Sequence, residues 1–236
     1  MAEPLLLIPG MMCDARVFSP QITEFSTERA VQVASVTNCD SITEMAKAVL
    51  VSAPAHFALA GISMGAMVAM EILRHAPQRV TRIALMSTNS QAELPTVAAS
   101  REPQIVKVMA GRLEEVMQDV MRSEYLADGP SQSKVLALVT AMANRLGEGE
   151  FVRQSRALQR RPDQQKTLRG IRMPALVLCG LQDTLTLPRR HQFMSELIPY
   201  ASLCEIEEAG HLPTLEAPAK TNAALRQWLD QPLVLR

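Results

Sequence analysis

The segment Gly61-Ile62-Ser63-Met64-Gly65 limits the possible folds of this chain more than any other segment. An apolar run at residues 56–60 leads into it, and a helical pattern at residues 66–75 follows it. A serine between a strand and a helix sits on a turn so tight that the residues two positions before and after it must be small. Glycine meets that need at both positions. Such a turn exposes the serine hydroxyl beside the N-terminus of the helix, where backbone N–H groups can hold an anion.

This strand–serine–helix pattern is typical of a nucleophile elbow, and the alternative is a small-residue turn without chemistry. Two later segments favour the nucleophile. Asp183 follows an apolar strand pattern at residues 174–178, and His211 follows another at residues 202–207. A carboxylate and an imidazole on loops at the ends of strands can reach a serine at the same edge of a sheet. The order Ser63, Asp183, His211 differs from the orders in chymotrypsin and subtilisin.

With these motifs in this order, the sequence resembles the α/β-hydrolase fold superfamily, and within it the small, cofactor-free esterases, lactonases and carbon–carbon-bond hydrolases. The resemblance covers nearly the whole chain. It rests on four segments: the strand and glycine at 5–10, the elbow at 61–65, the acid loop at 180–183 and the histidine loop at 210–218. The chain departs from the family pattern at Pro9-Gly10, where the family usually has His-Gly, and at Pro188, which lies one position late.

The resemblance implies a doubly wound, mostly parallel sheet with shortened or absent N-terminal strands and an inserted helical cap. The sequence itself shows strand patterns at 4–8, 30–36, 56–60, 80–86, 174–179 and 201–207. It shows helical patterns at 16–26, 42–52, 64–76, 188–198 and 215–230. We therefore expect a core of residues 1–90 and 173–236 and a cap, or lid, of residues 91–172. The spacing in the cap predicts three or four helices over the carboxyl ends of the strands.

The same resemblance assigns a role to each candidate site residue. Ser63 is the expected nucleophile, His211 the general base that takes its proton, and Asp183 the acid that orients the imidazole. An anionic tetrahedral intermediate needs two hydrogen-bond donors. We expect these to be the backbone N–H groups of Met64 and Met11, with the N–H of Met12 the weaker candidate.

Each assignment has an alternative. Asp183 can also be a turn-capping aspartate. The family's other position for the acid follows the strand that ends near residue 86, but Asn89 there cannot supply a carboxylate. Asp14 and Asp40 lie in early loops and are much weaker candidates. The other histidines receive no catalytic role, because they are interpreted as a strand start, a helix end and a helix surface: His56, His75 and His191.

Composition limits which binding partners and which cellular compartment are expected. Lysine and arginine balance aspartate and glutamate, so the formal net charge is zero, and a surface that follows a phosphate backbone is not expected. No signal peptide or membrane helix is evident in the sequence. The four cysteines are scattered without a CxxC pair, so reduced thiols and a cytoplasmic location are expected. We predict a small-molecule substrate, no nucleic acid, no membrane, no cofactor and no metal; the oligomeric state stays open.

The prediction for function is a serine hydrolase that cleaves a carboxylic ester or lactone through a Ser-His-Asp triad and an acyl-enzyme. Two alternatives stay open. One is a carbon–carbon-bond hydrolase, acyltransferase or perhydrolase on the same triad, and the other is a low-turnover ligand receptor of the same fold. Six arginines between residues 153 and 172 either recognise an anionic substrate or form a solvated helix face.

Overall fold

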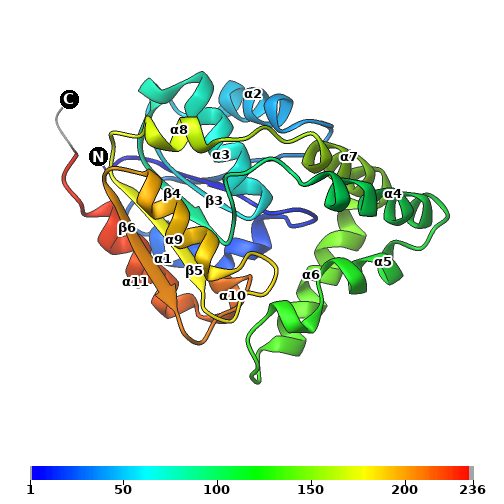
Figure 1. The fold of residues 1–236 in the computed structure, drawn as a ribbon. Coiled ribbons are helices and arrows are strands. Elements are labelled where there is room, and N and C mark those ends of the chain that lie inside the picture. Colours follow the sequence, from blue (N-terminus) through cyan, green and yellow to red (C-terminus); the bar gives the residue numbers. More distant parts are fainter. Residues whose placement is uncertain (1, 234–236) are drawn as a thin grey trace.

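The computed structural model describes residues 2–233. Within them, six strands form one sheet in the order β2-β1-β3-β4-β5-β6, and every neighbouring pair is parallel (Figure 1). The strands are β1 (Leu5–Ile8), β2 (Val31–Val33), β3 (Phe57–Ile62), β4 (Val80–Met86), β5 (Ala175–Gly180) and β6 (Ala201–Ile206). The predicted α/β class and the doubly wound, mostly parallel sheet with an inserted helical segment are confirmed.

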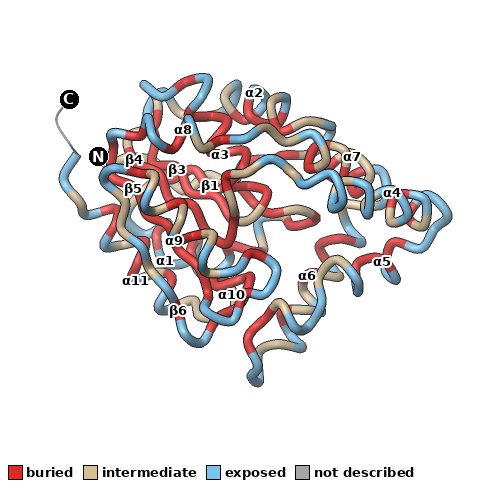
Figure 2. The backbone as a smooth tube through the Cα atoms, viewed as in Figure 1, coloured by how far each residue is buried: buried red, intermediate tan, exposed pale blue. Residues whose placement is uncertain are grey.

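The central strands are apolar at nearly every position because both faces of the sheet are covered. In β1, Leu5 and Leu7 belong to one buried cluster and Leu6 and Ile8 to another, as the alternation of side chains along a strand requires. The first cluster includes Trp228 and extends into the inserted helices. Figure 2 shows the resulting band of buried backbone through the sheet.

Helices pack on both faces of the sheet. The first cluster includes buried residues of α1 (Ser19–Phe25) and α11 (Pro218–Leu229), and the second includes those of α2 (Ile42–Ser52), α3 (Met64–His75) and α9 (Pro188–Leu197). The helix predicted at 215–230 is two helices, α10 (Pro213–Glu216) and α11, because the chain breaks at Ala217 before a proline that starts the second helix.

The insertion between β4 and β5 contains more helices than the sequence predicts. In the described chain it holds five α-helices rather than three or four: α4 (Pro95–Met109), α5 (Leu113–Val120), α6 (Gln132–Leu146), α7 (Glu148–Gln159) and α8 (Gln165–Arg169). The last of these is only five residues long and follows the segment that returns to the sheet, so its pattern was too short to recognise. Figure 1 shows α4, α5 and α6 beyond one end of the sheet.

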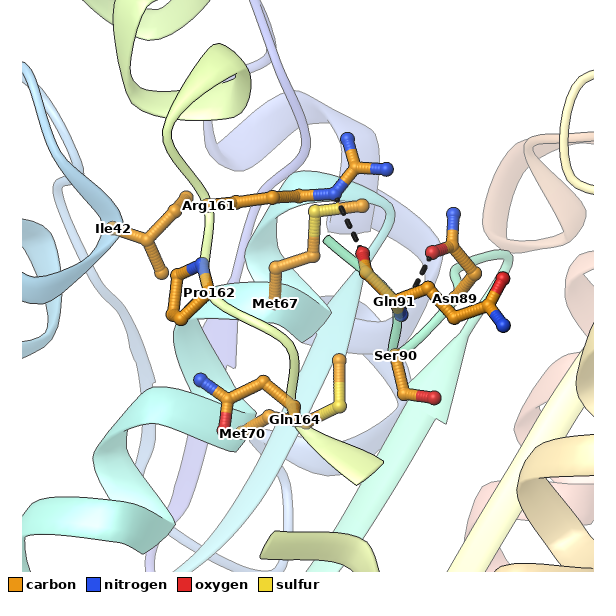
Figure 3. Close-up of a pocket in the computed structure, with 9 residues that line it drawn as sticks. All are labelled: Ile42, Met67, Met70, Asn89, Ser90, Gln91, Arg161, Pro162 and Gln164. Carbon is orange, nitrogen blue, oxygen red and sulfur yellow. Dashed lines mark hydrogen bonds between the residues drawn. The ribbon is translucent and has the colours of Figure 1, made fainter. Parts of the chain in front are cut away.

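The two segments that connect the insertion to the sheet lie against each other (Figure 3). The Gln164 N–H donates to the Ser90 carbonyl at 2.7 Å, and the Arg161 Nε donates to the Gln91 carbonyl at 3.0 Å. The Gln164 side chain also donates to Glu71 on α3 at 2.6 Å. The outgoing and returning segments are therefore joined to each other and to the core at one place, which we call the neck.

Glu71 anchors the neck to the core. Its side chain is fully buried and accepts hydrogen bonds from Thr43, Arg74 and Gln164. Burial by itself would raise the pKa of this carboxyl, but these three hydrogen bonds outweigh it and lower the pKa to about 2. Glu71 is therefore ionised over the whole neutral range, and the buried charge has hydrogen-bond partners on α2, on α3 and in the neck.

No helix within residues 2–233 combines the length and the apolar character needed to cross a membrane.

Candidate active site

The turn at Ser63 has the geometry that its flanking glycines predict. Ser63 has φ of 54° and ψ of −120°, a conformation that residues other than glycine rarely adopt. A Cβ at Gly61 would lie 2.5 Å from the Gly65 carbonyl oxygen, and a Cβ at Gly65 would lie 2.1 Å from the Ile8 carbonyl oxygen. Only glycine fits at these two positions, because the contacts are with backbone that cannot move aside.

Ser63, His211 and Asp183 form one hydrogen-bonded chain of side chains. The Ser63 Oγ lies 3.1 Å from His211 Nε2, and His211 Nδ1 lies 2.9 Å from Asp183 Oδ2. Asp183 and His211 are both buried. Burial alone would raise the pKa of Asp183, but the charge of His211 and hydrogen bonds from His211 and Thr186 hold that pKa below its usual range. The three residues named from the sequence thus meet in space.

The Asp183 carboxylate has further donors that fix its direction. Its Oδ1 accepts the Leu185 N–H at 2.9 Å and the Thr186 N–H at 2.8 Å, and its Oδ2 accepts the Thr186 hydroxyl at 2.5 Å. This turn follows directly after β5 and leaves Oδ2 facing the imidazole. The turn-capping interpretation of Asp183 therefore holds together with, and not instead of, its contact with His211.

Glu216 holds the loop that carries His211. One carboxylate oxygen accepts the Leu212 N–H at 2.6 Å, and the other accepts the N–H groups of Gly210 at 2.9 Å and Ala127 at 2.6 Å. The His211 N–H donates to the Tyr125 carbonyl at 2.7 Å. Tyr125 and Ala127 belong to the insertion, so the histidine loop is bonded both to itself and to the inserted segment.

The residues expected to supply the oxyanion donors lie beside Ser63. Gly10, Met11 and Met64 line the same cavity as Ser63. A Cβ at Gly10 would stand 3.3 Å from the Ser63 Cβ, so the loop after β1 is in contact with the elbow. The Met12 N–H is already used, because it donates to the side chain of Gln154 at 2.8 Å.

A cavity of about 500 Å³ opens over Ser63 and His211. The insertion supplies much of its wall, including Val97, Met117 and Met121. Of the six arginines between 153 and 172, Arg161 lines this cavity, and it pairs with Glu93, whose side chain is nearly fully buried. Three of the others pair with carboxylates of the protein: Arg153 with Glu150, Arg156 with Glu102, and Arg160 with Asp40. The pairs of the more exposed Arg153, Arg156 and Arg160 agree with the solvated-face interpretation, whereas Arg161 at the cavity wall does not.

His191 corrects one interpretation from the sequence. It was assigned to a helix surface, but it is fully buried on α9. Its Nε2 accepts the Thr88 N–H at 2.8 Å, and the Thr88 hydroxyl donates to the Ser63 carbonyl at 3.0 Å. His191 therefore supports the backbone of the elbow from behind. The signal was present in the sequence, because in the helical pattern predicted at 188–198 the apolar residues Met194 and Ile198 fall on the same face as His191, although α9 itself ends at Leu197.

Buried His191 makes stability depend on pH. Desolvation lowers its pKa from 6.5 to about 4, because the folded protein disfavours the charged ring. Between these two values the unfolded chain binds a proton that the folded chain does not, so falling pH favours unfolding. We expect the His191 contribution, about 3 kcal/mol in the free energy of unfolding, to be lost as pH falls from about 6.5 to about 4.

The measurement is urea unfolding of the wild type and His191→Gln from about pH 7 to about pH 4. The glutamine keeps a carbonyl acceptor for Thr88 and does not titrate. The advantage of the wild type over the variant should shrink steadily across this range. Parallel curves for the two proteins would show that His191 does not carry the effect.

The fold and this cluster define a class of protein. A serine on a strained turn between a parallel strand and a helix, bonded to a histidine and an acid from later strand ends, is the arrangement of α/β hydrolases. A family model for the Alpha/beta hydrolase family matches residues 5–224. The chain belongs to this family.

Solved structures of other proteins have the same fold as this chain. An esterase from Thermogutta terrifontis superposes with a TM-score of 0.87 at 24% identity, over 97% of this chain and 90% of that one. The enol-lactonase from Burkholderia xenovorans LB400 superposes with a TM-score of 0.86 at 19% identity, over 98% of this chain and 92% of that one. These similarities show the α/β-hydrolase fold.

A similarity in sequence extends to a longer protein. The dihydrolipoyllysine-residue acetyltransferase component of the acetoin cleaving system of Pseudomonas putida is 27% identical over 187 residues. The match covers 72% of this chain and 45% of that protein, so the chain spans less than half the length of this relative.

Proposed function

We propose that this protein is a serine hydrolase that cleaves a carboxylic ester or a lactone. The observation that carries the proposal is the continuous contact from Asp183 through His211 to the Ser63 hydroxyl, beneath a cavity of about 500 Å³. The Thermogutta terrifontis esterase and the Burkholderia xenovorans enol-lactonase share the fold that holds this contact. One is named as an esterase and the other as an enol-lactonase, which supports the choice of an acyl substrate with an oxygen leaving group.

The chemistry follows from the order of the contacts. His211 Nε2 takes the proton of Ser63 as the Oγ attacks the substrate carbonyl, and Asp183 stabilises the imidazolium that forms. The proton then passes from His211 to the departing alkoxide, which leaves an acyl group on Ser63. In the second half, His211 takes a proton from water, the resulting attack forms the carboxylic acid, and Ser63 regains its proton.

The negative oxygen of each tetrahedral intermediate needs donors that are already in place. We assign them to the backbone N–H groups of Met11 and Met64, because both residues lie at the cavity beside Ser63. Met64 is the first residue of α3, so the positive end of that helix adds to the stabilisation. The Met12 N–H is excluded from this role because Gln154 accepts it.

Acyl transfer is a second candidate on the same residues. The Pseudomonas putida relative, 27% identical over 187 residues, is named as an acetyltransferase component. Hydrolysis and transfer share the acyl-enzyme and differ only in whether water or another nucleophile accepts the acyl group. The ratio of acid to transfer product, measured with a thiol or alcohol acceptor present, separates the two.

The first experiment combines labelling with turnover. A fluorophosphonate probe should label wild-type protein at Ser63, and p-nitrophenyl esters of increasing acyl length, together with simple lactones, should be turned over repeatedly. Labelling without turnover on any ester or lactone would favour a low-turnover receptor. Labelling at a different serine would refute the assignment of the nucleophile.

We further propose that residues 91–172 act as the cap, or lid, that selects the substrate. The proposal rests on the cavity wall, since Val97, Met117, Val120 and Met121 come from α4, α5 and the turn after α5 and face the space above Ser63. Flexible thioethers adapt their shape to different acyl chains. The cap then controls acyl length without supplying the nucleophile, the base or the acid.

Two cap methionines should respond differently to truncation. Met117 is buried in the main cluster, so Met117→Ala should lower the free energy of unfolding by about 2–5 kcal/mol. Met121 is half-buried at the cavity, so Met121→Ala should cost less stability and shift the kcat/KM ratio between short and long esters. Chemical unfolding and the ester series measure the two effects. An unchanged acyl preference in both variants would remove the support for a selective cap.

The compartment is the last part of the proposal. All four cysteines are free, and burial raises the pKa of Cys13 and Cys179 to about 12. Unpaired, unreactive thiols fit a protein that works in a reducing compartment such as the cytoplasm.

A further inference from the structure

The loop that follows β1 is held in an unusual conformation beside the nucleophile. Met12 is fully buried and has φ of 54°, in the left-handed region that side chains other than glycine rarely adopt. A residue in this region persists only when its surroundings fix it. The Met12 N–H donates to Gln154 Oε1 at 2.8 Å, and neither residue lines the cavity.

Gln154 comes from the insertion, 142 residues further along the chain. It lies on α7 and is fully buried. Its amide can face only one way, because the oxygen must accept from Met12 while the NH₂ group donates to Glu150 Oε1 at 3.0 Å. The amide oxygen is therefore directed at the Met12 N–H by a second hydrogen bond on its other side.

Glu150 is itself fixed. It is buried, and its other oxygen accepts the Asn38 N–H at 3.1 Å and the Arg153 Nε at 3.0 Å. The series Asn38, Glu150, Gln154, Met12 thus runs from the loop after β2, through helix α7, to the loop beside Ser63. Every link is a hydrogen bond that involves a buried acceptor, so the amide oxygen has little freedom to move.

We propose that Gln154 is a positioning residue for the oxyanion hole. The hydrogen bond to Gln154 fixes the Met11–Met12 peptide and holds Met12 in the left-handed conformation. The Gly10–Met11 peptide is thereby oriented so that the Met11 N–H faces the substrate oxygen that becomes negative when Ser63 attacks. Gln154 also keeps the Met12 N–H out of the cavity, so one backbone donor and not two comes from this loop. The inference rests on the proposed serine-hydrolase function, and it makes α7 part of the catalytic support.

The test compares an ester with the thionoester in which sulfur replaces the carbonyl oxygen. Sulfur accepts hydrogen bonds weakly, so an intact oxyanion hole favours the oxygen ester, and a misaligned one loses that preference. Gln154→Met keeps the length of the side chain and removes the acceptor. We expect its kcat to fall at least about tenfold with little change in KM, and its oxygen-to-sulfur rate ratio to fall by a similar factor.

Two companion variants make the result specific. Gln159 lies on the same helix, and its side chain donates hydrogen bonds to Ala98 and Glu102 on α4. Gln159→Met removes these bonds, so it should weaken packing of the insertion without changing the oxygen-to-sulfur rate ratio. The second variant combines Glu150→Gln with Gln154→Glu. It places a carboxylate acceptor opposite the Met12 N–H and, at position 150, an amide that donates to this carboxylate. This double variant should recover most of the rate ratio that Gln154→Met loses.

The outcomes are separable. If Ser63→Ala keeps the esterase activity, the proposed function fails, whatever Gln154 does. If activity depends on Ser63 but Gln154→Met lowers ester and thionoester rates equally, or leaves both unchanged, the positioning role is wrong. If Gln154→Met does not fold, Gln154→Asn carries the same test, because a side chain one methylene shorter withdraws the acceptor from Met12.

Discussion

Replacing Ser63 with alanine is expected to lower kcat for ester hydrolysis by about 10⁶-fold and to abolish fluorophosphonate labelling. The reason is that the Ser63 Oγ is the one atom of the side-chain cluster placed to attack a carbonyl in the cavity, and alanine removes it. The fold should survive, because the Ser63 backbone bonds to Met86 and Thr88 stay in place. Steady-state kinetics and mass spectrometry of the labelled protein give the two readouts.

Ser100→Ala is a matched control, since Ser100 lines the same cavity and its hydroxyl bonds only within its own helix, to the Val97 carbonyl. This variant should label and turn over as the wild type does. Substantial activity in Ser63→Ala, with its circular dichroism unchanged, would mean that the reaction does not pass through this serine.

Replacing Asp183 with asparagine should lower kcat by about 10⁴-fold while the protein stays folded. An amide that turns its NH₂ group toward His211 forces Nδ1 to accept, so Nε2 carries the proton and cannot take another from Ser63. An amide that turns its oxygen toward His211 instead presents NH₂ to the N–H groups of Leu185 and Thr186, which then lose their acceptor. Only the first orientation keeps the acceptor of these two N–H groups, so it is favoured, and it is the orientation that disables the base.

Activity of Asp183→Asn is measured at saturating ester, with thermal unfolding in parallel. Asp163→Asn is the control, because this exposed carboxylate accepts the Gln165 N–H at the start of α8 and does not line the cavity. It should keep full activity. A loss in Asp183→Asn that is explained entirely by unfolding would remove the case for an acid at this position.

The sequence predicts the fold well because local rules decide it. Unbroken apolar runs such as Leu5–Ile8 can be strands only in a sheet covered on both faces, and the structure has such a sheet. The turn at Ser63 is also predictable from local sequence, because backbone crowding excludes any residue other than glycine at Gly61 and Gly65. The nearness of Ser63, Asp183 and His211 then follows from strand ends meeting at one edge, and their catalytic roles stay a prediction.

The features that the sequence missed depend on contacts between distant segments. Gln154 reaches Met12 across 142 residues, and nothing near either residue signals the pairing. The break at Ala217 is a local exception, because Pro218 starts a new helix there and the helical pattern that continues across it conceals the break. His191 is different, because the sequence places it on an apolar helix face. The polarity of its side chain nevertheless led to the prediction of an exposed position, and the residue is buried.

The neck has a consequence for how members of this family diversify. Because Ser90 and Gln164 meet at 2.7 Å, the 73 residues from 91 to 163 leave the sheet and return to it at the same point. Lengthening a loop whose ends already meet adds only about 0.6 kcal/mol of entropy for each doubling. We therefore expect that the segment can be exchanged at the neck without disturbing a strand, provided that the replacement restores the contacts that Tyr125 and Ala127 make with the histidine loop. Replacing this segment with one from another family member removes Gln154. Replacements that carry a glutamine at the equivalent turn of their last long helix should therefore keep the catalytic rate.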